Sequence, residues 1–243
     1  MKTVLITGAN KGIGFETAKQ MASLGYFVYL GSRDKEKGDK AVTILNDMGF
    51  SNIAPVRIDI SDSDSIKNAR VEMEKKIASL DVLINNAGIL GTMPQYPTTT
   101  SIENYKSVFQ TNVFGTIEVT QQFLELLKKS ESPRIVNVSS EVGSLTENSN
   151  PNWFKYESVK PFFAVYGAAK SAVNAYTIAL AYELRNTKFK VNSVTPGHTA
   201  TDFNNFKGTK TVEEGAKPIV KCATLSDEGA TGKFYSEEGE VRW

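Results

Sequence analysis

The turn that decides the fold reads Thr7-Gly8-Ala9-Asn10-Lys11-Gly12-Ile13-Gly14. It stands between a short apolar run at residues 3–6 and a segment with helical periodicity. Glycine tolerates positive φ and lets the backbone approach a ligand closely, and the N–H groups of a helix start attract phosphate. An ordinary tight turn is the alternative, but strand, glycines and helix follow in the order that a dinucleotide site needs. The stretch therefore indicates a site for a pyrophosphate.

Short β-branched runs alternate with longer helical patterns along the chain, which indicates parallel strands covered on both faces. The expected strands are residues 3–6, 27–30, 53–58, 81–84, 134–138 and 190–194. The expected helices are residues 13–24, 34–48, 62–79, 101–128 and 163–186. No repeat or linker marks an internal boundary. We therefore expect one α/β domain over residues 1–243, a Rossmann-type doubly wound parallel sheet with helices on both faces.

The amino-acid composition limits which classes of binding partner are expected. Lys plus Arg total 28 against 27 for Asp plus Glu, a net charge of +1, so no long-range field favours nucleic acid or an anionic membrane. No apolar run approaches the roughly 20 residues needed to span a bilayer, and no signal-peptide pattern is seen. With one cysteine, Cys222, and one histidine, His198, neither a disulfide nor a thiolate-rich metal site is expected. We expect a cytoplasmic protein with a small-molecule partner and no metal.

Three further strings follow predicted strands or lie in a predicted helix. They are Asn85-Asn86-Ala87-Gly88, Tyr166-Gly167-Ala168-Ala169-Lys170 and Pro196-Gly197. Together with the Gly-x-x-x-Gly-x-Gly spacing of the turn, they make the chain resemble the short-chain dehydrogenase/reductase family. The stretch from Glu213 to Trp243 is similar to the carbonyl reductase branch. The resemblance implies NADP(H)-dependent reduction of the carbonyl group of small aldehydes or ketones.

Reduction of a ketone needs a proton donor at oxygen, and a phenol is a poor acid unless its anion is stabilised. Tyr166 and Lys170 lie four apart, so both project from one helix face, where the ammonium is expected to lower the phenol pKa. The resemblance implies that Tyr166 is the general acid and that Ser140 hydrogen-bonds the substrate oxygen. It also implies that Asn112 holds a water in a proton relay through Lys170. Singly, each residue has a structural explanation, but their joint occurrence favours catalysis.

The resemblance also implies the cofactor contacts. They are Gly8, Asn10, Lys11, Gly12, Ile13, Gly14, Arg33, Asp59, Ile60, Asn86, Ala87, Gly88, Tyr166, Lys170, Pro196, Gly197, the backbone of Thr199 and the side chain of Thr201. A site that prefers NAD usually has an acidic residue at the end of the second strand, where this chain has Gly31-Ser32-Arg33. Arg33 and Lys11 would flank a 2′-phosphate, so we expect NADP(H). Asp34 would favour NAD(H) instead if it bonded a bare ribose.

Other functions fit less well. A regulator that senses NADP(H) without turnover would not need the set of Ser140, Tyr166 and Lys170. Enoyl reductases space their tyrosine and lysine further apart, and sugar-nucleotide epimerases usually carry a longer substrate domain. A hydrolase would need His198 as its histidine, yet no Gly-x-Ser-x-Gly elbow occurs. We read His198 as a solvent-facing loop residue, and Thr211 with Glu214 as a helix capping box.

The segment at residues 144–162 is an insertion of loop and short helix, rich in Asn, Pro and aromatic residues. In the commonest family members the interval between Ser140 and Tyr166 is about half as long, and the helix that carries the tyrosine packs against a second subunit. We expect the apolar residues of the insertion to cover that helix face and leave the protein a monomer. The alternative is a lid over the substrate cleft. The aromatic residues favour an apolar or aromatic ketone as substrate.

Overall fold

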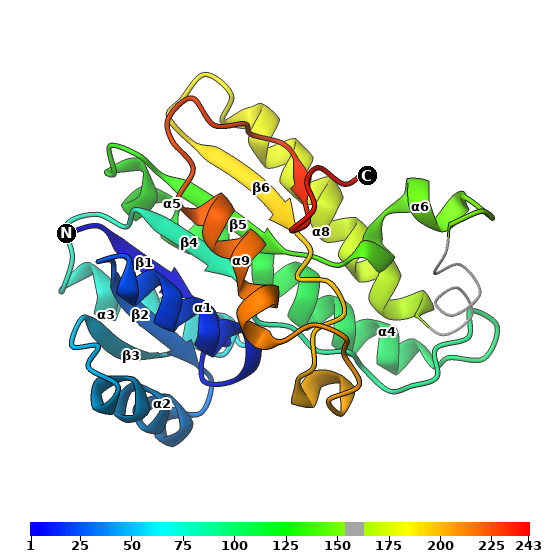
Figure 1. Cartoon of the computed structure of the whole chain (residues 1–243), viewed down its shortest axis with the longest axis horizontal. Helices are drawn as coiled ribbons and strands as arrows, with labels where there is room; N and C mark the ends of the chain where they lie inside the picture. Colours follow the sequence, from blue (N-terminus) through cyan, green and yellow to red (C-terminus); the bar gives the residue numbers. More distant parts are fainter. Residues whose placement is uncertain (154–162) are drawn as a thin grey trace.

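The computed structural model describes residues 1–153 and 163–243, and its centre is one parallel β-sheet (Figure 1). Seven strands lie in the order β3-β2-β1-β4-β5-β6-β7. Their bounds are β1 Thr3–Ile6, β2 Phe27–Ser32, β3 Ile53–Arg57, β4 Val82–Asn85, β5 Arg134–Val138, β6 Lys190–Val194 and β7 Phe234–Tyr235. Every pair of neighbouring strands is parallel. The doubly wound, Rossmann-type sheet expected from the sequence is confirmed.

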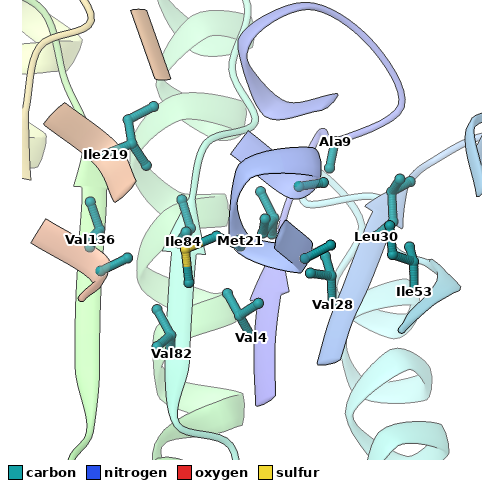
Figure 2. Packing of buried hydrophobic residues seen from close by; sticks show 14 of the residues in the cluster. Val4, Ala9, Met21, Val28, Leu30, Ile53, Val82, Ile84, Val136 and Ile219 are labelled. Atoms are coloured by element: carbon teal, nitrogen blue, oxygen red, sulfur yellow. The ribbon is translucent and has the colours of Figure 1, made fainter. Parts of the chain in front are cut away.

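Helices cover both faces because side chains of successive strand residues point to opposite sides. Val4 and Ile6 face α1 (Gly12–Ser23), α2 (Lys35–Asp47) and α9 (Val212–Ala223), and Figure 2 shows this cluster with Met21 and Ile219. Leu5 faces α3 (Ser63–Glu74), α5 (Thr116–Lys128) and α8 (Ala164–Glu183). Both clusters are almost fully buried, so the sheet is a rigid support for the loops at its carboxyl edge.

The expected helix over residues 101–128 is wrong as a single α-helix. It divides into α4 (Ile102–Phe109), a π-helical segment η1 (Gln110–Gly115) and α5. A β-carbon on Gly115 would stand 2.2 Å from the carbonyl oxygen of Ile60, so the helix and the loop after β3 touch at that glycine. Periodicity cannot reveal such a bulge, because the apolar spacing continues through it. π-Bulges of this kind often occur at functional sites.

The other elements for which a range was expected agree closely with it, except that α3 ends at Glu74 and not at residue 79. No range was predicted for α9 or β7. Just after Glu74, the backbone N–H groups of Lys76 and Ile77 both donate hydrogen bonds to the carbonyl of Met73. The capping box of α9 is confirmed, since Thr211 N donates to Glu214 Oε2 at 2.8 Å and Glu214 N donates to Thr211 Oγ1 at 3.2 Å.

Only part of the inserted segment lies within the described residues. It begins directly after η2 (Glu141–Gly143) and contains the short helix α6 (Leu145–Ser149). This part of the segment is bonded to the carboxyl terminus. Ser144 Oγ donates to the carbonyl of Arg242 at 2.7 Å, and Thr146 N donates to that of Trp243 at 2.8 Å. The expected roles of Phe154, Tyr156 and Phe162 fall outside the described residues. No helix in residues 1–153 or 163–243 is long and apolar enough to cross a membrane.

Candidate active site

The candidate site lies at the carboxyl edge of the sheet, where strand order reverses between β1 and β4. Open α/β sheets bind ligands at this edge. The glycine turn follows β1, Asn86 to Gly88 follow β4, Ser140 follows β5, and Pro196-Gly197 follow β6. The fold thus brings Ser140 to the same edge as three of the four strings that the sequence singles out, and α8 carries the fourth.

Close backbone packing fixes the glycine turn. Gly8 and Gly12 have φ of 63° and 58°, a conformation that favours glycine. A β-carbon at Gly14 would stand 2.5 Å from Asn86 Nδ2 and from the carbonyl oxygen of Gly8, and one at Gly8 would stand 2.8 Å from Ala87 Cα. The Asn86 amide donates to the carbonyls of Thr7 and Gly8 at 2.9 and 3.1 Å. The glycine turn and the loop after β4 are therefore packed tightly against each other.

Helix α1 begins at Gly12, within this turn. Its N-cap residue, Lys11, provides no side-chain cap, and no acidic residue stands in the first turn. Uncapped amides at a helix start favour an anion. The glycine cradle and these amides fit the pyrophosphate of a nicotinamide dinucleotide.

Three charged side chains surround the expected site of the adenosine ribose. Arg33 is exposed and forms no ion pair within the described residues. Lys11 pairs with Asp202, so its ammonium is already engaged. Asp34 is the N-cap of α2 and accepts from Lys37 N at 3.1 Å, a bond that lowers the pKa of Asp34 below its usual value. The carboxylate of Asp34 is thus used to begin a helix.

Most of the other residues that are expected to contact the cofactor form hydrogen bonds within the protein. Asp59 Oδ1 accepts from the hydroxyl of Ser61 at 2.7 Å, and Ile60 is buried. Thr199 N donates to the carbonyl of Gly197 at 3.0 Å, and Thr201 N donates to Asn204 Oδ1 at 3.2 Å. The loop after β6 therefore keeps its shape through internal bonds. His198 in this loop is exposed, as expected.

Ser140, Tyr166 and Lys170 meet beside the carboxyl end of β5. The Ser140 side chain lies beside the phenol of Tyr166 and favours its ionised form, which lowers its pKa. Lys170 Nζ lies 5.5 Å from the centroid of the Tyr166 ring and donates to the carbonyl of Val138 at 2.7 Å. The lysine side chain is only 4% exposed. The expected convergence of the three side chains is present in the structure.

The pKa values of this pair differ from the sequence expectation. Burial raises the pKa of Tyr166 well above that of a free tyrosine, and only the Ser140 side chain opposes this effect. Burial also lowers the pKa of Lys170 to about 8. The expectation that Lys170 lowers the Tyr166 pKa is not met here. The physical reason is that the ammonium points to Val138 and that its own charged form is disfavoured inside the protein.

Asn112 lies in η1, and its side chain bonds to the backbone of Ile89 in both directions. Its Oδ1 accepts from Ile89 N and its Nδ2 donates to Ile89 O, each at 2.8 Å. A β-carbon on Gly88 would stand 3.2 Å from Asn112 Oδ1 and 3.7 Å from Lys170 Nζ. The amide and the ammonium thus approach the same glycine, although the side-chain amide of Asn112 is itself occupied.

Sequence reasoning missed three residues of the site. Thr7 is buried, and its hydroxyl accepts from the backbone N–H groups of Asn86 and Ala87, both at 3.0 Å. Gln95 is fully buried and bonds to the backbone of Tyr166. Phe203 lies with its ring centroid 5.7 Å from that of Tyr166. Only Thr7 had a local signal, since it opens the turn motif, whereas Gln95 and Phe203 reach Tyr166 through tertiary structure.

A cavity of about 230 Å³ lies between η2, α6 and the carboxyl-terminal tail, and Ser140 is not among its lining residues. Its wall includes the ring of Trp153 and the side chain of Val241 together with charged groups. The tail is held in place by Trp243, whose ring stacks on Phe234 at 5.6 Å. The tail therefore forms one wall of this cavity.

Fold and site together define a dinucleotide-binding oxidoreductase. The chain matches the family described as short chain dehydrogenase over residues 2–211. A short-chain dehydrogenase of Penicillium roqueforti is 39% identical over 242 residues, covering 98% of this chain and 95% of the relative. This protein belongs to the short-chain dehydrogenase/reductase family, as the sequence motifs suggested.

Two solved structures agree with this assignment. Salutaridine reductase from Papaver somniferum superposes with a TM-score of 0.85 at 30% identity, over 97% of this chain and 99% of that one. An NADPH-bound carbonyl reductase from chicken fatty liver gives a TM-score of 0.86 at 25% identity, over 100% and 99%. The similarity extends over the whole domain, including the carboxyl-terminal tail.

Proposed function

We propose that this protein reduces the carbonyl group of small aldehydes or ketones to alcohols with NADPH, and that Tyr166 is the general acid. The observation that carries the proposal is the position of the Tyr166 phenol, which lies beside the Ser140 side chain and the buried Lys170 ammonium. This group stands beside a turn that fits a dinucleotide pyrophosphate. When bound, the cofactor supplies a hydride to the carbonyl carbon.

Side chains of this protein would bind the carbonyl oxygen of the substrate and supply the proton that it receives. Ser140 and Tyr166 would donate hydrogen bonds to the carbonyl oxygen, which stabilises the negative charge that develops there. The raised pKa of Tyr166 keeps its proton in place at neutral pH, and an alkoxide is a much stronger base than a phenolate. Lys170, fixed by its hydrogen bond to the carbonyl of Val138, would hold the nicotinamide ribose beside the phenol. Asn112 would complete the route by which solvent returns the proton.

Three observations support NADPH over NADH. Arg33 is exposed and unpaired within the described residues, so its guanidinium is free for a 2′-phosphate. Asp34 caps α2 and is therefore not directed to a bare ribose. The second solved relative is itself described as NADPH-bound. A cytoplasmic location and a monomeric state remain predictions from the sequence.

The test is a panel of aldehydes, ketones and alcohols with each cofactor, followed by nicotinamide absorbance. Tyr166→Phe should keep NADP⁺ binding and lower kcat by at least about 100-fold, because the proton donor is lost. Ser140→Ala should lower kcat by a similar order, because the oxygen loses a donor. Near-normal turnover by Tyr166→Phe would contradict the mechanism. Cofactor binding without turnover of any carbonyl compound would favour a sensor, and equal kcat/KM with NADH would refute the cofactor preference.

A further inference from the structure

The helix that carries Tyr166 begins without a cap of its own. Its N-cap residue is Phe163, whose side chain cannot accept a hydrogen bond. The N–H of the third helical residue, which is Tyr166, is one that an N-cap side chain normally satisfies. A residue from elsewhere must therefore satisfy it, or this amide stays unbonded close to the catalytic phenol.

Gln95, which lies 71 positions earlier in the chain, supplies that bond. Tyr166 N donates to Gln95 Oε1 at 2.9 Å, and Ala164 N donates to the backbone carbonyl of Gln95 at 3.2 Å. Gln95 also pairs with Phe163 in a parallel β-bridge. Its side chain is 0% exposed, so water does not compete for these bonds.

The other end of the Gln95 amide is fixed as well. Gln95 Nε2 donates to the carbonyl of Leu90 at 2.7 Å. The preceding residue, Ile89, is bonded in both directions by Asn112, and Thr92 is bonded in both directions by Asn104 at 2.9 Å. One short segment after β4 therefore links the Asn112 side of the site to the Tyr166 side.

We infer that Gln95 is a positioning residue: it fixes the first turn of α8 and thereby the distance of the Tyr166 phenol from Ser140 and from the substrate oxygen. This inference rests on the proposed function for its kinetic consequence. Gln95 does not touch the reacting atoms, and it acts through the backbone of Tyr166. A displacement of about 1 Å at a reacting group can cost about 100-fold in rate.

Gln95→Met tests the inference, because methionine has a similar volume and cannot form either bond. We expect kcat to fall by about 10- to 100-fold, with the Kd for NADP⁺ and the KM for the carbonyl substrate changed less than about twofold. Gln95→Glu keeps the acceptor for Tyr166 N, and a carboxylate at a helix start is favourable, so it should retain more of kcat than Gln95→Met.

Asn192→Leu is the matched control. Asn192 is 1% exposed and also joins two backbone groups, the carbonyl of Ala230 and the N–H of Lys233, both at 2.9 Å. It lies in β6 and contacts none of the catalytic side chains. The loss of its side-chain amide should lower the melting temperature, as we also expect for Gln95→Met, but should leave kcat of the folded protein unchanged. An equal fall of kcat in both variants would overturn the positioning role.

Amide hydrogen exchange measured by NMR gives a readout that needs no substrate. In Gln95→Met the protection of Tyr166 N–H should fall by at least about tenfold, while that of amides in the middle of α8 changes much less. Unchanged protection at Tyr166 would overturn the inference even if no substrate were found. If the wild-type protein turned over no carbonyl compound but Tyr166 lost protection, only the proposed function would fail.

Discussion

The phosphate-binding turn and the catalytic face lie side by side at the same edge of the sheet, but they are built differently. Backbone packing shapes the turn, and Gly8 and Gly14 leave no room for a β-carbon. The candidate catalytic face instead depends on two ionisable groups, the half-buried Tyr166 and the buried Lys170, whose ammonium is held by a hydrogen bond to Val138. A turn of this kind is determined by neighbouring residues in the sequence, whereas a catalytic face forms through contacts between segments that are distant in the sequence.

The first way to break this comparison is Gly14→Ala in the turn. Its β-carbon would stand 2.5 Å from two polar atoms, so Asn86 or the Gly8 peptide must move. We expect NADP⁺ affinity to fall by at least about tenfold and stability by about 1–3 kcal/mol. Isothermal titration and thermal unfolding measure the two effects.

Gly25→Ala serves as the control for Gly14→Ala. Gly25 has φ of 81° and nothing within 4 Å of the added carbon, so the change strains the backbone without a clash. It should destabilise the protein by about 1–2 kcal/mol and leave cofactor affinity unaltered. If both variants lost affinity alike, general destabilisation and not the shape of the turn would explain the result.

The second prediction concerns the catalytic face and its dependence on pH. The pKa of Lys170 is about 8 in the folded protein, below the value of 10.5 for a free lysine. Between these values the unfolded chain binds more protons than the folded one, so unfolding free energy rises with pH. Relative to Lys170→Met, the wild-type protein should gain about 2 kcal/mol between pH 7 and pH 10.

Denaturant unfolding at several pH values measures this difference, and Lys170→Met removes the contributions common to both proteins. The series should stop at pH 10, where tyrosines of the unfolded chain begin to ionise. A stability difference that stayed flat over this range would mean that Lys170 is not penalised by burial. In that case, burial of ionisable groups would not distinguish the catalytic face from the phosphate-binding turn.

The sequence predicted the turn and most of the sheet because their signals are local. Glycine spacing, apolar runs and the Thr211–Glu214 capping box each act within a few residues. The sequence also predicted that Ser140 and Tyr166 lie close together, because both match positions of the family's motifs. It could not predict the π-helical segment at Gln110–Gly115 or the bond from Gln95 to Tyr166 N, which arise only when distant segments pack.

The third prediction addresses the ion pair that joins the turn to the loop after β6. Lys11 pairs with Asp202, and their side chains are 66% and 42% exposed. The 2′-phosphate would compete with Asp202 for the Lys11 ammonium. Because exposed pairs are worth up to about 1 kcal/mol, Asp202→Asn should tighten NADP⁺ binding by about two- to fivefold and NAD⁺ binding less.

Glu131→Gln is a suitable control for Asp202→Asn, because it removes an exposed partner of Lys188 at the opposite edge of the sheet. It should leave both cofactor affinities unchanged. Weaker NADP⁺ binding in Asp202→Asn would show that the pair holds the site together and does not compete with the phosphate. Raised ionic strength should shrink the effect, since the pair is exposed to solvent.

The smallest expected effect is on oligomeric state. We predict a monomer, although the face of α8 that includes Ile178 and Tyr182 is exposed by 43% and 67%. A stable dimer needs an interface of about 1,000 Å² or more, so pairing through α8 should depend on these side chains. Light scattering at micromolar concentration should give a mass near 26.6 kDa, and Ile178→Glu should leave it unchanged. A wild-type dimer that Ile178→Glu splits would show that α8 pairs two copies, and that the inserted segment at residues 144–162 does not block this face.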